Sequence, residues 1–217
     1  MKLVYFNLRG LAENSRLLLA INNQEYEDFR YNFSVVDAST YKFNKPEFDN
    51  DKENGLLLKS MNKLPYLEVD GSIICQSKSI ERYLAHRFDM MGDNLIDCAR
   101  IDSICEAVRD IKDAYQKVRR TPEEEKEQAM NTWFNETLVE KINLLDNLFD
   151  SEGLYCINNK LSLADIVVYS LVTQFFDNVE GSMKAASQNK RVLDIVNNVS
   201  SLESVQNWIR KRPNTIF

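Results

Sequence analysis

The sequence has 217 residues, of which 44% are hydrophobic and 28% are charged, and its formal net charge is −6. This length suffices for one large domain or two smaller ones that share an interface, and the composition is ordinary for a soluble globular protein. The acidic excess lies in residues 88–217, which hold 15 basic and 21 acidic side chains, against 12 and 12 in residues 1–87. Because a nucleic-acid-binding surface needs a basic excess, we expect no nucleic-acid partner.

The sequence contains four cysteines and one histidine, namely Cys75, Cys98, Cys105, Cys156 and His86. No two cysteines form C-x-x-C, so we expect reduced, partly buried thiols and neither a disulfide framework nor a metal site. The histidine falls among surface charges of an expected helix, which argues against a Ser-His-Asp or Cys-His mechanism. Since the chain shows no signal peptide and no long apolar run, we expect a cytoplasmic protein without a membrane partner.

The first part of the chain alternates between strand and helix patterns. Residues 2–6 predict a buried strand, Asn7–Gly10 a short loop, and Glu13–Asn22 a helix with one apolar face. A second strand is expected within Tyr26–Val36. Residues 37–62 are mostly polar and contain a proline and a glycine, so they predict a loop with short helical turns.

A β-hairpin and a helix follow. Two apolar runs, Tyr66–Val69 and Ser72–Cys75, flank Asp70-Gly71, a dipeptide that favours a tight hairpin turn because it accepts positive φ angles. Leu64-Pro65 precedes the hairpin, and a proline without an N–H group fits the start of a strand. After the hairpin the spacing becomes helical, with one face formed by Ile80, Tyr83, Leu84 and Arg87.

Gln76 and Ser77 lie where the second strand of the hairpin ends and the helix begins. The first N–H groups of a helix and the positive end of its dipole bind anions, and a serine hydroxyl adds a donor. This corner therefore suits a carboxylate or a phosphate. In the alternative interpretation, Ser77 is an ordinary helix N-cap, the commonest role of such a serine.

Residues 88–217 predict helices almost throughout, after a linker at Phe88–Asp93. A stripe of apolar side chains with helical spacing indicates a long first helix, and it consists of Ile101, Ile104, Cys105, Val108, Ile111, Tyr115 and Val118. Thr121 is expected to cap the next helix, because proline and glutamates follow it directly.

A second capping-box pattern, Ser162 with Asp165, opens an apolar helix that is expected to run to Phe176. The pattern concerns the folding of the helical part. Asp165 is therefore interpreted as structural rather than catalytic.

Three stretches of the chain resemble the sigma class of glutathione transferases, a group that includes haematopoietic prostaglandin D synthase. They are K-L-V-Y-F-N-L-R-G-L-A-E from Lys2, the unit of Pro65, hairpin, Gln76-Ser77 and helix, and V-Q-N-W-I-R-K-R-P-N-T at 205–215. The resemblance implies a thioredoxin-like α/β domain at residues 1–87 and an all-α domain at residues 88–217. It further implies a homodimeric detoxification enzyme that conjugates the thiolate of its co-substrate glutathione to small hydrophobic electrophiles.

In this family the position of Tyr5 is catalytic, and its hydroxyl donates a hydrogen bond to the glutathione sulfur. A phenol suits this role because a free thiol, with a pKa of ~8.5, is mostly protonated at neutral pH, and a donor aimed at sulfur favours the thiolate. The alternative for Tyr5 is an aromatic strand residue that fills the core.

The resemblance also assigns the residues that hold glutathione. Lys63, Leu64 and Pro65 belong to the loop that pairs with the cysteinyl backbone of the tripeptide. Gln76 and Ser77 bind the γ-glutamyl carboxylate.

Asp110 aligns with an acidic residue that reaches the glutamyl amine bound by the partner subunit, although a solvated helix face is the alternative. Phe48 and Lys52 share the spacing of the residues that contact the glycyl end. Lys59 is a rival for this role, and a solvated loop lysine is the alternative.

Two departures from the family pattern bear on activity. Many relatives carry R-G-R-x-E, whereas Leu11 stands at the second arginine position, so we expect weaker activation of the thiol. Lys117 stands where prostaglandin D synthase has a tryptophan, so prostaglandin synthesis is not expected. Leu8, Lys112 and Tyr115 are candidates to line the electrophile pocket.

Two other functions remain open from the sequence. One is a non-catalytic relative, such as a crystallin-like scaffold or a scaffold domain of a translation factor. The other is a carrier of haem or lipophilic anions.

Overall fold

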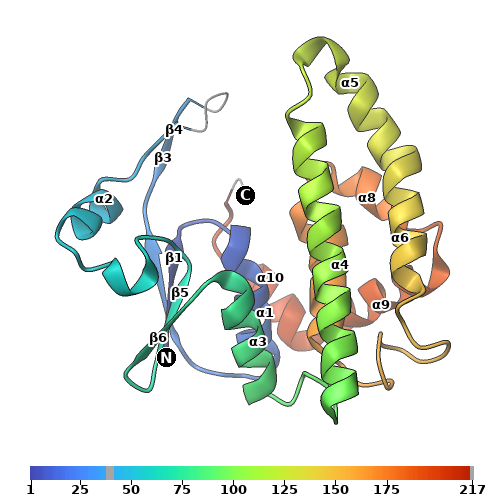
Figure 1. The fold of residues 1–217 in the computed structure, drawn as a ribbon, viewed down its shortest axis with the longest axis horizontal. Helices are drawn as coiled ribbons and strands as arrows, with labels where there is room; N and C mark the ends of the chain where they lie inside the picture. Colours follow the sequence, from blue (N-terminus) through green and yellow to red (C-terminus); the bar gives the residue numbers. More distant parts are fainter. Residues whose placement is uncertain (38–41, 216–217) are drawn as a thin grey trace. The chain divides into compact units, whose positions relative to one another are not determined.

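The computed structural model describes residues 1–37 and 42–215, which form two compact units (Figure 1). Unit 1 contains Met1–Leu84 together with the residues from Asn207 onward, and unit 2 contains Ala85–Gln206. The sequence predicted domains at residues 1–87 and 88–217. It did not predict that the residues from Asn207 onward pack with the first unit.

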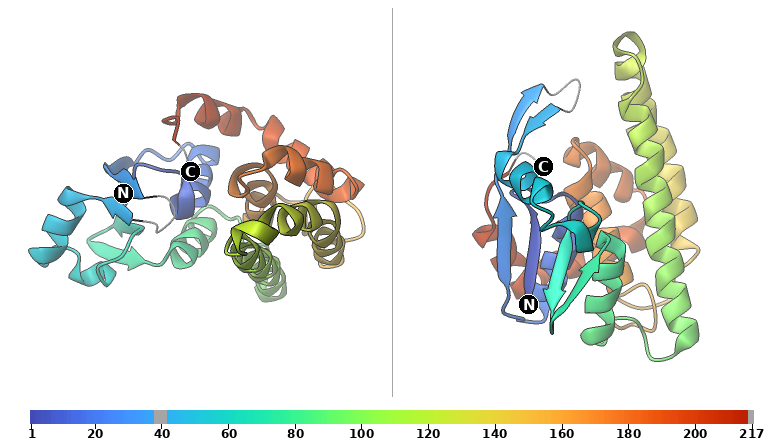
Figure 2. Two further views of the ribbon diagram at one scale, coloured as in Figure 1. Left: turned by 90° about the horizontal axis from the view of Figure 1, so that it is seen from above. Right: turned by 60° about the vertical axis from the view of Figure 1, so that its left-hand side comes forward.

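Unit 1 is built on a sheet with the strand order β2-β1-β5-β6. Strand β1 (Lys2–Phe6) pairs in parallel with β2 (Glu27–Tyr31) and antiparallel with β5 (Tyr66–Val69), which forms a hairpin with β6 (Ser72–Cys75). Helices α1 (Glu13–Ile21) and α3 (Ser77–Arg87) lie on one face of the sheet, and α2 (Pro46–Glu53) lies on the other (Figure 2). This mixed sheet with its helices has the βαβ–ββα order of the predicted thioredoxin-like domain, which is thereby confirmed.

The alternation of side chains along β1 decides which residue faces which layer. Val4 packs in a cluster on the α2 side with Tyr31, Phe48, Leu57 and Tyr66. Its neighbours Leu3 and Tyr5 therefore point to the opposite face, the side of α1 and α3. A fully buried large apolar side chain such as Leu3 stabilises the fold by about 1.5–3 kcal/mol relative to its exposure to water.

The stretch 37–62 contains more regular structure than predicted. Strands β3 (Ser34–Asp37) and β4 (Lys42–Asn44) form a separate antiparallel pair, and α2 and a short 3₁₀ helix, η2 (Leu58–Ser60), follow. Residues 38–41 of this stretch lie outside the described residues. The predicted helical turns are confirmed by α2 and η2, whereas the pairing of β3 with β4 was not predicted.

Unit 2 is helical, as predicted. Its first helix, α4 (Leu95–Arg119), lies beside the continuous helical rod of residues 123–146 (Figure 1). The elements after α4 are α5 (Glu123–Thr132), the π-helical segment η3 (Trp133–Thr137), α6 (Leu138–Asp146), α7 (Leu163–Ser170), the π-helical segment η4 (Leu171–Phe175), α8 (Val179–Ala186), α9 (Lys190–Ser201) and the beginning of α10 (Glu203–Lys211). The residues of α10 from Asn207 onward belong to unit 1.

The two predicted helix caps of unit 2 had different outcomes. Thr121 does not cap α5, because Pro122 is extended and the helix begins one residue later, at Glu123, with no side-chain cap. The Ser162–Asp165 capping box at α7 is confirmed. One Asp165 oxygen accepts hydrogen bonds from the N–H and the hydroxyl of Ser162, both at 2.8 Å, and the other accepts from the N–H of Cys156 at 2.7 Å.

Within residues 1–37 and 42–215, no helix is both long and apolar enough to cross a membrane.

Candidate active site

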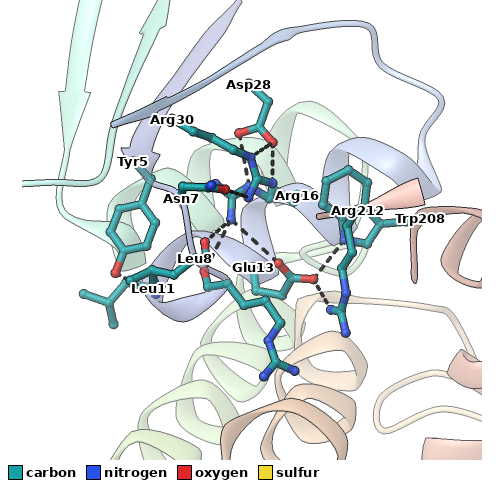
Figure 3. A network of polar contacts seen from close by, with 11 residues as sticks. Tyr5, Asn7, Leu8, Leu11, Glu13, Arg16, Asp28, Arg30, Trp208 and Arg212 are labelled. Atoms are coloured by element: carbon teal, nitrogen blue, oxygen red, sulfur yellow. Dashed lines mark hydrogen bonds and ion pairs between the residues drawn. The ribbon is translucent and has the colours of Figure 1, made fainter. Parts of the chain in front are cut away.

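Tyr5 is 7% exposed, and its hydroxyl lies against the backbone of the loop after β1 (Figure 3). The N–H of Leu11 donates a hydrogen bond to Tyr5 Oη at 3.1 Å. Gly10 makes this approach possible: its φ is +41°, and a Cβ there would lie 2.7 Å from Tyr5 Oη and 2.3 Å from Leu8 Cδ1. The loop thus presents a backbone donor to the phenol oxygen with no side chain in between.

Burial raises the pKa of Tyr5 above its ordinary value, and the Leu11 N–H and the Arg16 guanidinium only partly offset this. The phenol is therefore neutral at pH 7. Its oxygen already accepts one hydrogen bond, and within the described part of unit 1 the hydroxyl proton has no acceptor. The arrangement leaves an O–H donor polarised by the Leu11 N–H and available to an incoming anion.

Arg16 holds the loop in place through its guanidinium group (Figure 3). Its side chain is fully buried, and its Nη1 donates to the carbonyl of Leu8 at 2.7 Å and to that of Arg9 at 3.4 Å. Its Nε donates to Asp28 Oδ1 at 3.1 Å, and its guanidinium carbon lies 5.9 Å from the centre of the Tyr5 ring. One cation therefore fixes the loop, strand β2 and the phenol relative to one another.

The charged network continues from Arg16 to the end of the chain. Glu13, also buried, lies 3.8 Å from Arg16 and accepts hydrogen bonds from Trp208 Nε1 at 2.9 Å and from Arg212 (Figure 3). The sequence pattern does not identify Glu13 as a neighbour of Trp208 and Arg212. No local pattern could reveal them, because they are separated by almost the whole chain.

The sheet register aligns three predicted site residues. Val4 pairs with Tyr66 and Tyr66 with Cys75, so one residue further along, Tyr5, Pro65 and Gln76 share the same end of three neighbouring strands. The Leu64–Pro65 peptide bond is cis. Within residues 1–37 and 42–215, neither the N–H nor the C=O of Leu64 has a hydrogen-bond partner, so this backbone edge is open to another chain.

Helix α3 begins at Ser77, directly after this edge. Gln76 is exposed, has a φ of +72°, and its carbonyl accepts the N–H of Ile80 at 3.0 Å as the first helical hydrogen bond. The first N–H groups of α3 therefore stand at the same sheet end as Tyr5. This combination suits an anionic group attached to a peptide backbone.

The residues predicted for the glycyl end differ in exposure. Phe48 is 6% exposed, and its ring centre lies 5.1 Å from that of Phe6 and 5.7 Å from that of Tyr31, so it is a core residue of unit 1. Its burial leaves its predicted contact with a ligand without support. Lys52 and its rival Lys59 are exposed, and so is Lys63 of the loop predicted to pair with the cysteinyl backbone.

The remaining predicted residues are on α4 and in the loop after β1. Asp110 is exposed, and Lys112 Nζ lies 5.0 Å from the ring centre of Phe175. Tyr115 is 1% exposed, and its ring contacts the rings of Trp133, Phe134, Phe175 and Phe176. Burial raises its pKa to about 12.

This packing gives Tyr115 a structural role and leaves its predicted place in an electrophile pocket without support. Leu8 is partly buried in unit 1. Because the units are described separately, a pocket shared by Leu8 and Lys112 stays a prediction.

Residues 1–86 match the family described as "Glutathione S-transferase, N-terminal domain", and residues 109–212 match "Glutathione S-transferase, C-terminal domain". The chain is 30% identical over 216 residues to hematopoietic prostaglandin D synthase of Gallus gallus, covering 99% of this chain and 97% of that protein. It is 29% identical over 214 residues to glutathione S-transferase S1 of Drosophila melanogaster, covering 98% and 79%.

A solved structure, the monomeric glutathione S-transferase Na-GST-3 of Necator americanus, superposes with a TM-score of 0.77 at 25% identity, covering 100% of this chain and 98% of that chain. A match of both domains, together with a full-length relative at this identity, shows the family. The chain belongs to the glutathione S-transferase family, and it is a glutathione transferase that uses glutathione as its co-substrate.

Proposed function

We propose that this enzyme, a sigma-class member of its family, conjugates the glutathione thiolate to small hydrophobic electrophiles, with Tyr5 as the catalytic residue. The observation that carries the proposal is the 3.1 Å hydrogen bond from the Leu11 N–H to Tyr5 Oη. It occupies a lone pair of the phenol and leaves the O–H to donate to sulfur. Lowering a thiol pKa by ~2 units requires roughly 2.7 kcal/mol, which one charge-assisted hydrogen bond and the local field can supply.

The rest of the tripeptide is held by the sheet end that carries Tyr5. The open backbone of Leu64, next to Pro65, pairs with the cysteinyl residue in the manner of an added strand. Gln76 and Ser77, at the start of α3, take the γ-glutamyl carboxylate. Lys52, with Lys59 as its rival, is the candidate to pair with the glycyl carboxylate, and both lysines are exposed.

Asp110 is proposed to act in a homodimer, where it reaches the glutamyl amine bound by the partner subunit. Its exposed position on α4 supports this role. The cytoplasmic location, the part in detoxification and the absence of nucleic-acid and membrane partners stay predictions.

The decisive experiment compares the wild type with Tyr5→Phe in the conjugation of chlorodinitrobenzene and in the pKa of bound glutathione, read from thiolate absorbance. We expect Tyr5→Phe to raise the bound thiol pKa by about 1–2 units and to lower kcat/KM at neutral pH by about 10- to 100-fold.

Tyr26→Phe is the matched control. Its hydroxyl is buried without a hydrogen-bond partner in the described residues, and removing it should leave both quantities unchanged. A Tyr5→Phe enzyme with wild-type activity and thiol pKa would refute the role of Tyr5.

A further inference from the structure

Asp28, on β2, joins two arginines of unit 1 (Figure 3). The register pairs Asp28 with Leu3 and Arg30 with Tyr5, so both side chains point to the same face of the sheet as Tyr5. One Asp28 oxygen accepts a hydrogen bond from Arg16 Nε at 3.1 Å. The other accepts from Arg30 Nε at 2.8 Å and from Arg30 Nη2 at 2.6 Å. One carboxylate therefore fixes two guanidinium groups.

Both arginines also bond the loop after β1 (Figure 3). Arg16 Nη1 donates to the carbonyl of Leu8 at 2.7 Å, and Arg30 Nη1 makes a longer hydrogen bond of 3.5 Å to Asn7 Oδ1. Two cations at such close quarters repel each other, and the carboxylate between them offsets that repulsion. Asp28 thus holds both cations where they can bond the loop.

Arg16 has a second carboxylate within reach. Its side chain is fully buried, and Glu13 Oε2 lies 3.8 Å from its Nη1, buried and without a hydrogen bond to any residue that the structure describes. Among those residues, Asp28 is the only carboxylate that forms a hydrogen bond with Arg16. A buried guanidinium needs such a partner. Without Asp28, Arg16 would turn toward Glu13, and its Nη1 would leave the carbonyl of Leu8.

We propose that Asp28 is a positioning residue of the transferase, which holds Arg16 on the loop after β1 and thereby aligns the Leu11 N–H with Tyr5. The inference rests on the proposed function, because the effect reaches the glutathione sulfur through Tyr5. Its sign distinguishes positioning from charge. Removal of a negative charge would by itself lower the pKa of the bound thiol, whereas displacement of the Leu11 donor raises it.

The test compares the wild type with Asp28→Asn, which keeps the shape of the side chain and removes its charge. We expect the pKa of bound glutathione, read from thiolate absorbance, to rise by about 0.5–1 unit. The kcat/KM for chlorodinitrobenzene at neutral pH should fall about 3- to 10-fold, and the KM for glutathione should change less than about 2-fold. Hydrogen exchange of the Leu11 amide, followed by NMR, should become about 10-fold faster.

Glu27→Gln is the matched control. It removes the same charge from the adjacent residue of β2, where Glu27 forms an exposed ion pair with Lys2 at 3.1 Å and is not bonded to Arg16. The pKa of bound glutathione and the exchange of the Leu11 amide should stay at their wild-type values.

Arg30→Gln is a second variant should Asp28→Asn fail to fold. It removes the two hydrogen bonds from Arg30 to Asp28 and leaves the bond from Arg16 in place. It should raise the pKa of bound glutathione and speed the exchange of the Leu11 amide, each by less than Asp28→Asn does. Wild-type values of both quantities in Arg30→Gln would count against the proposal.

Tyr5→Phe, measured in parallel, distinguishes a failure of this inference from a failure of the proposed function. A raised thiol pKa in Tyr5→Phe, with an unchanged or lowered one in Asp28→Asn, would overturn the positioning role alone. An unchanged thiol pKa in Tyr5→Phe, with faster exchange at Leu11 in Asp28→Asn, would refute the catalytic role of Tyr5 and support the hold of Asp28 on the loop.

The double variant tests the route of the effect. Because Asp28 acts through Tyr5, Asp28→Asn should not raise the pKa of bound glutathione any further in the Tyr5→Phe enzyme. Additive increases in the two single variants and the double variant would show that Asp28 reaches the thiol by another route, and they would overturn the proposal.

Discussion

Two opposing influences act on the phenol of Tyr5. Burial disfavours its phenolate, and the Leu11 N–H and Arg16 favour negative charge on its oxygen, with burial as the larger effect. The hydroxyl therefore keeps its proton while its oxygen is polarised by a donor. A residue in this state serves as a hydrogen-bond donor to a thiolate and not as a base that removes the thiol proton.

Replacing Gly10 with alanine tests how closely the loop must approach this phenol. The new Cβ would stand 2.7 Å from Tyr5 Oη at a φ of +41°, so the hydroxyl or the loop must move. We expect Gly10→Ala to raise the pKa of bound glutathione and to lower kcat/KM by about 10-fold or more. Titration of the thiolate absorbance measures the pKa of bound glutathione, and steady-state kinetics with chlorodinitrobenzene measure kcat/KM.

Gly71→Ala is the control for backbone strain alone. Gly71 has a φ of +76° in the β5–β6 turn, and a Cβ there would meet no atom within 4 Å. It should cost about 1–2 kcal/mol of stability without a change in the thiol pKa. Equal effects of the two variants on the thiol would contradict the role given to Gly10.

Leu11→Arg should lower the pKa of bound glutathione, by on the order of 0.5–1 unit, because it adds a cation near the thiolate. The site can take a longer side chain, since Leu11 is 56% exposed and its N–H, which bonds Tyr5, belongs to the backbone. Leu11→Gln adds length without charge and should leave the pKa unchanged. An unchanged or higher thiolate pKa in Leu11→Arg would refute the expectation.

At the scale of elements, local chemistry decided what the sequence could predict. The hairpin was predicted to the residue, because Asp70 and Gly71 both adopt the positive φ angles that such a turn demands. The start of α3 at Ser77 and the capping box at Ser162 were equally local signals.

The failures have physical reasons as well. Helix α2 was predicted only as short helical turns within a loop, because seven of its eight residues are polar or proline and only Phe48 anchors it to the core. Thr121 has the sequence of a cap, but the extended Pro122 that follows moves the helix start beyond its reach. Two features depend on tertiary contacts, which no short stretch of sequence contains. They are the alignment of Tyr5, Pro65 and Gln76 at one end of the sheet and the pairing of Glu13 with Arg212.

The capping box offers a prediction at this scale. Asp165→Ala leaves the buried N–H groups of Ser162 and Cys156 without their acceptor, so we expect a loss of about 3 kcal/mol in the free energy of unfolding. Ser162→Ala removes the hydroxyl alone and should cost about 1 kcal/mol. Urea denaturation followed by circular dichroism measures both.

Asp194→Ala is the matched surface control, because Asp194 belongs to an exposed ion pair with Lys190 within α9. It should change stability by less than about 0.5 kcal/mol. A loss for Asp165→Ala no larger than that of the control would show that the box does not stabilise unit 2.

At the scale of the whole molecule, the end of the chain belongs to unit 1 and not to the helices that precede it. Trp208 and Arg212 both donate hydrogen bonds to the buried carboxylate of Glu13. Glu13 forms an ion pair with Arg16, and Arg16 donates a hydrogen bond to the carbonyl of Leu8 in the loop after β1. Residues more than 190 positions apart therefore share one polar network. The C-terminal residues therefore help to stabilise the loop that contains the Leu11 N–H.

The proposed homodimer gives the last prediction. If Asp110 of one subunit completes the glutathione site of the other, Asp110→Asn should weaken glutathione binding about 10-fold, because a charge-assisted hydrogen bond to the glutamyl amine is lost. Dilution of the wild type below its dimer dissociation constant should weaken glutathione binding to the same extent. The same dilution should not weaken glutathione binding by Asp110→Asn any further. Calorimetry and sedimentation velocity at matched concentrations measure both quantities.

Asp113→Asn is the matched control, since Asp113 is also exposed and lies on the same helix one turn away. It should bind glutathione as the wild type does. A monomer that binds glutathione at full strength would contradict the role of Asp110. In that case Tyr5, Leu64 and Ser77, which belong to a single subunit, would have to account for the whole of the binding.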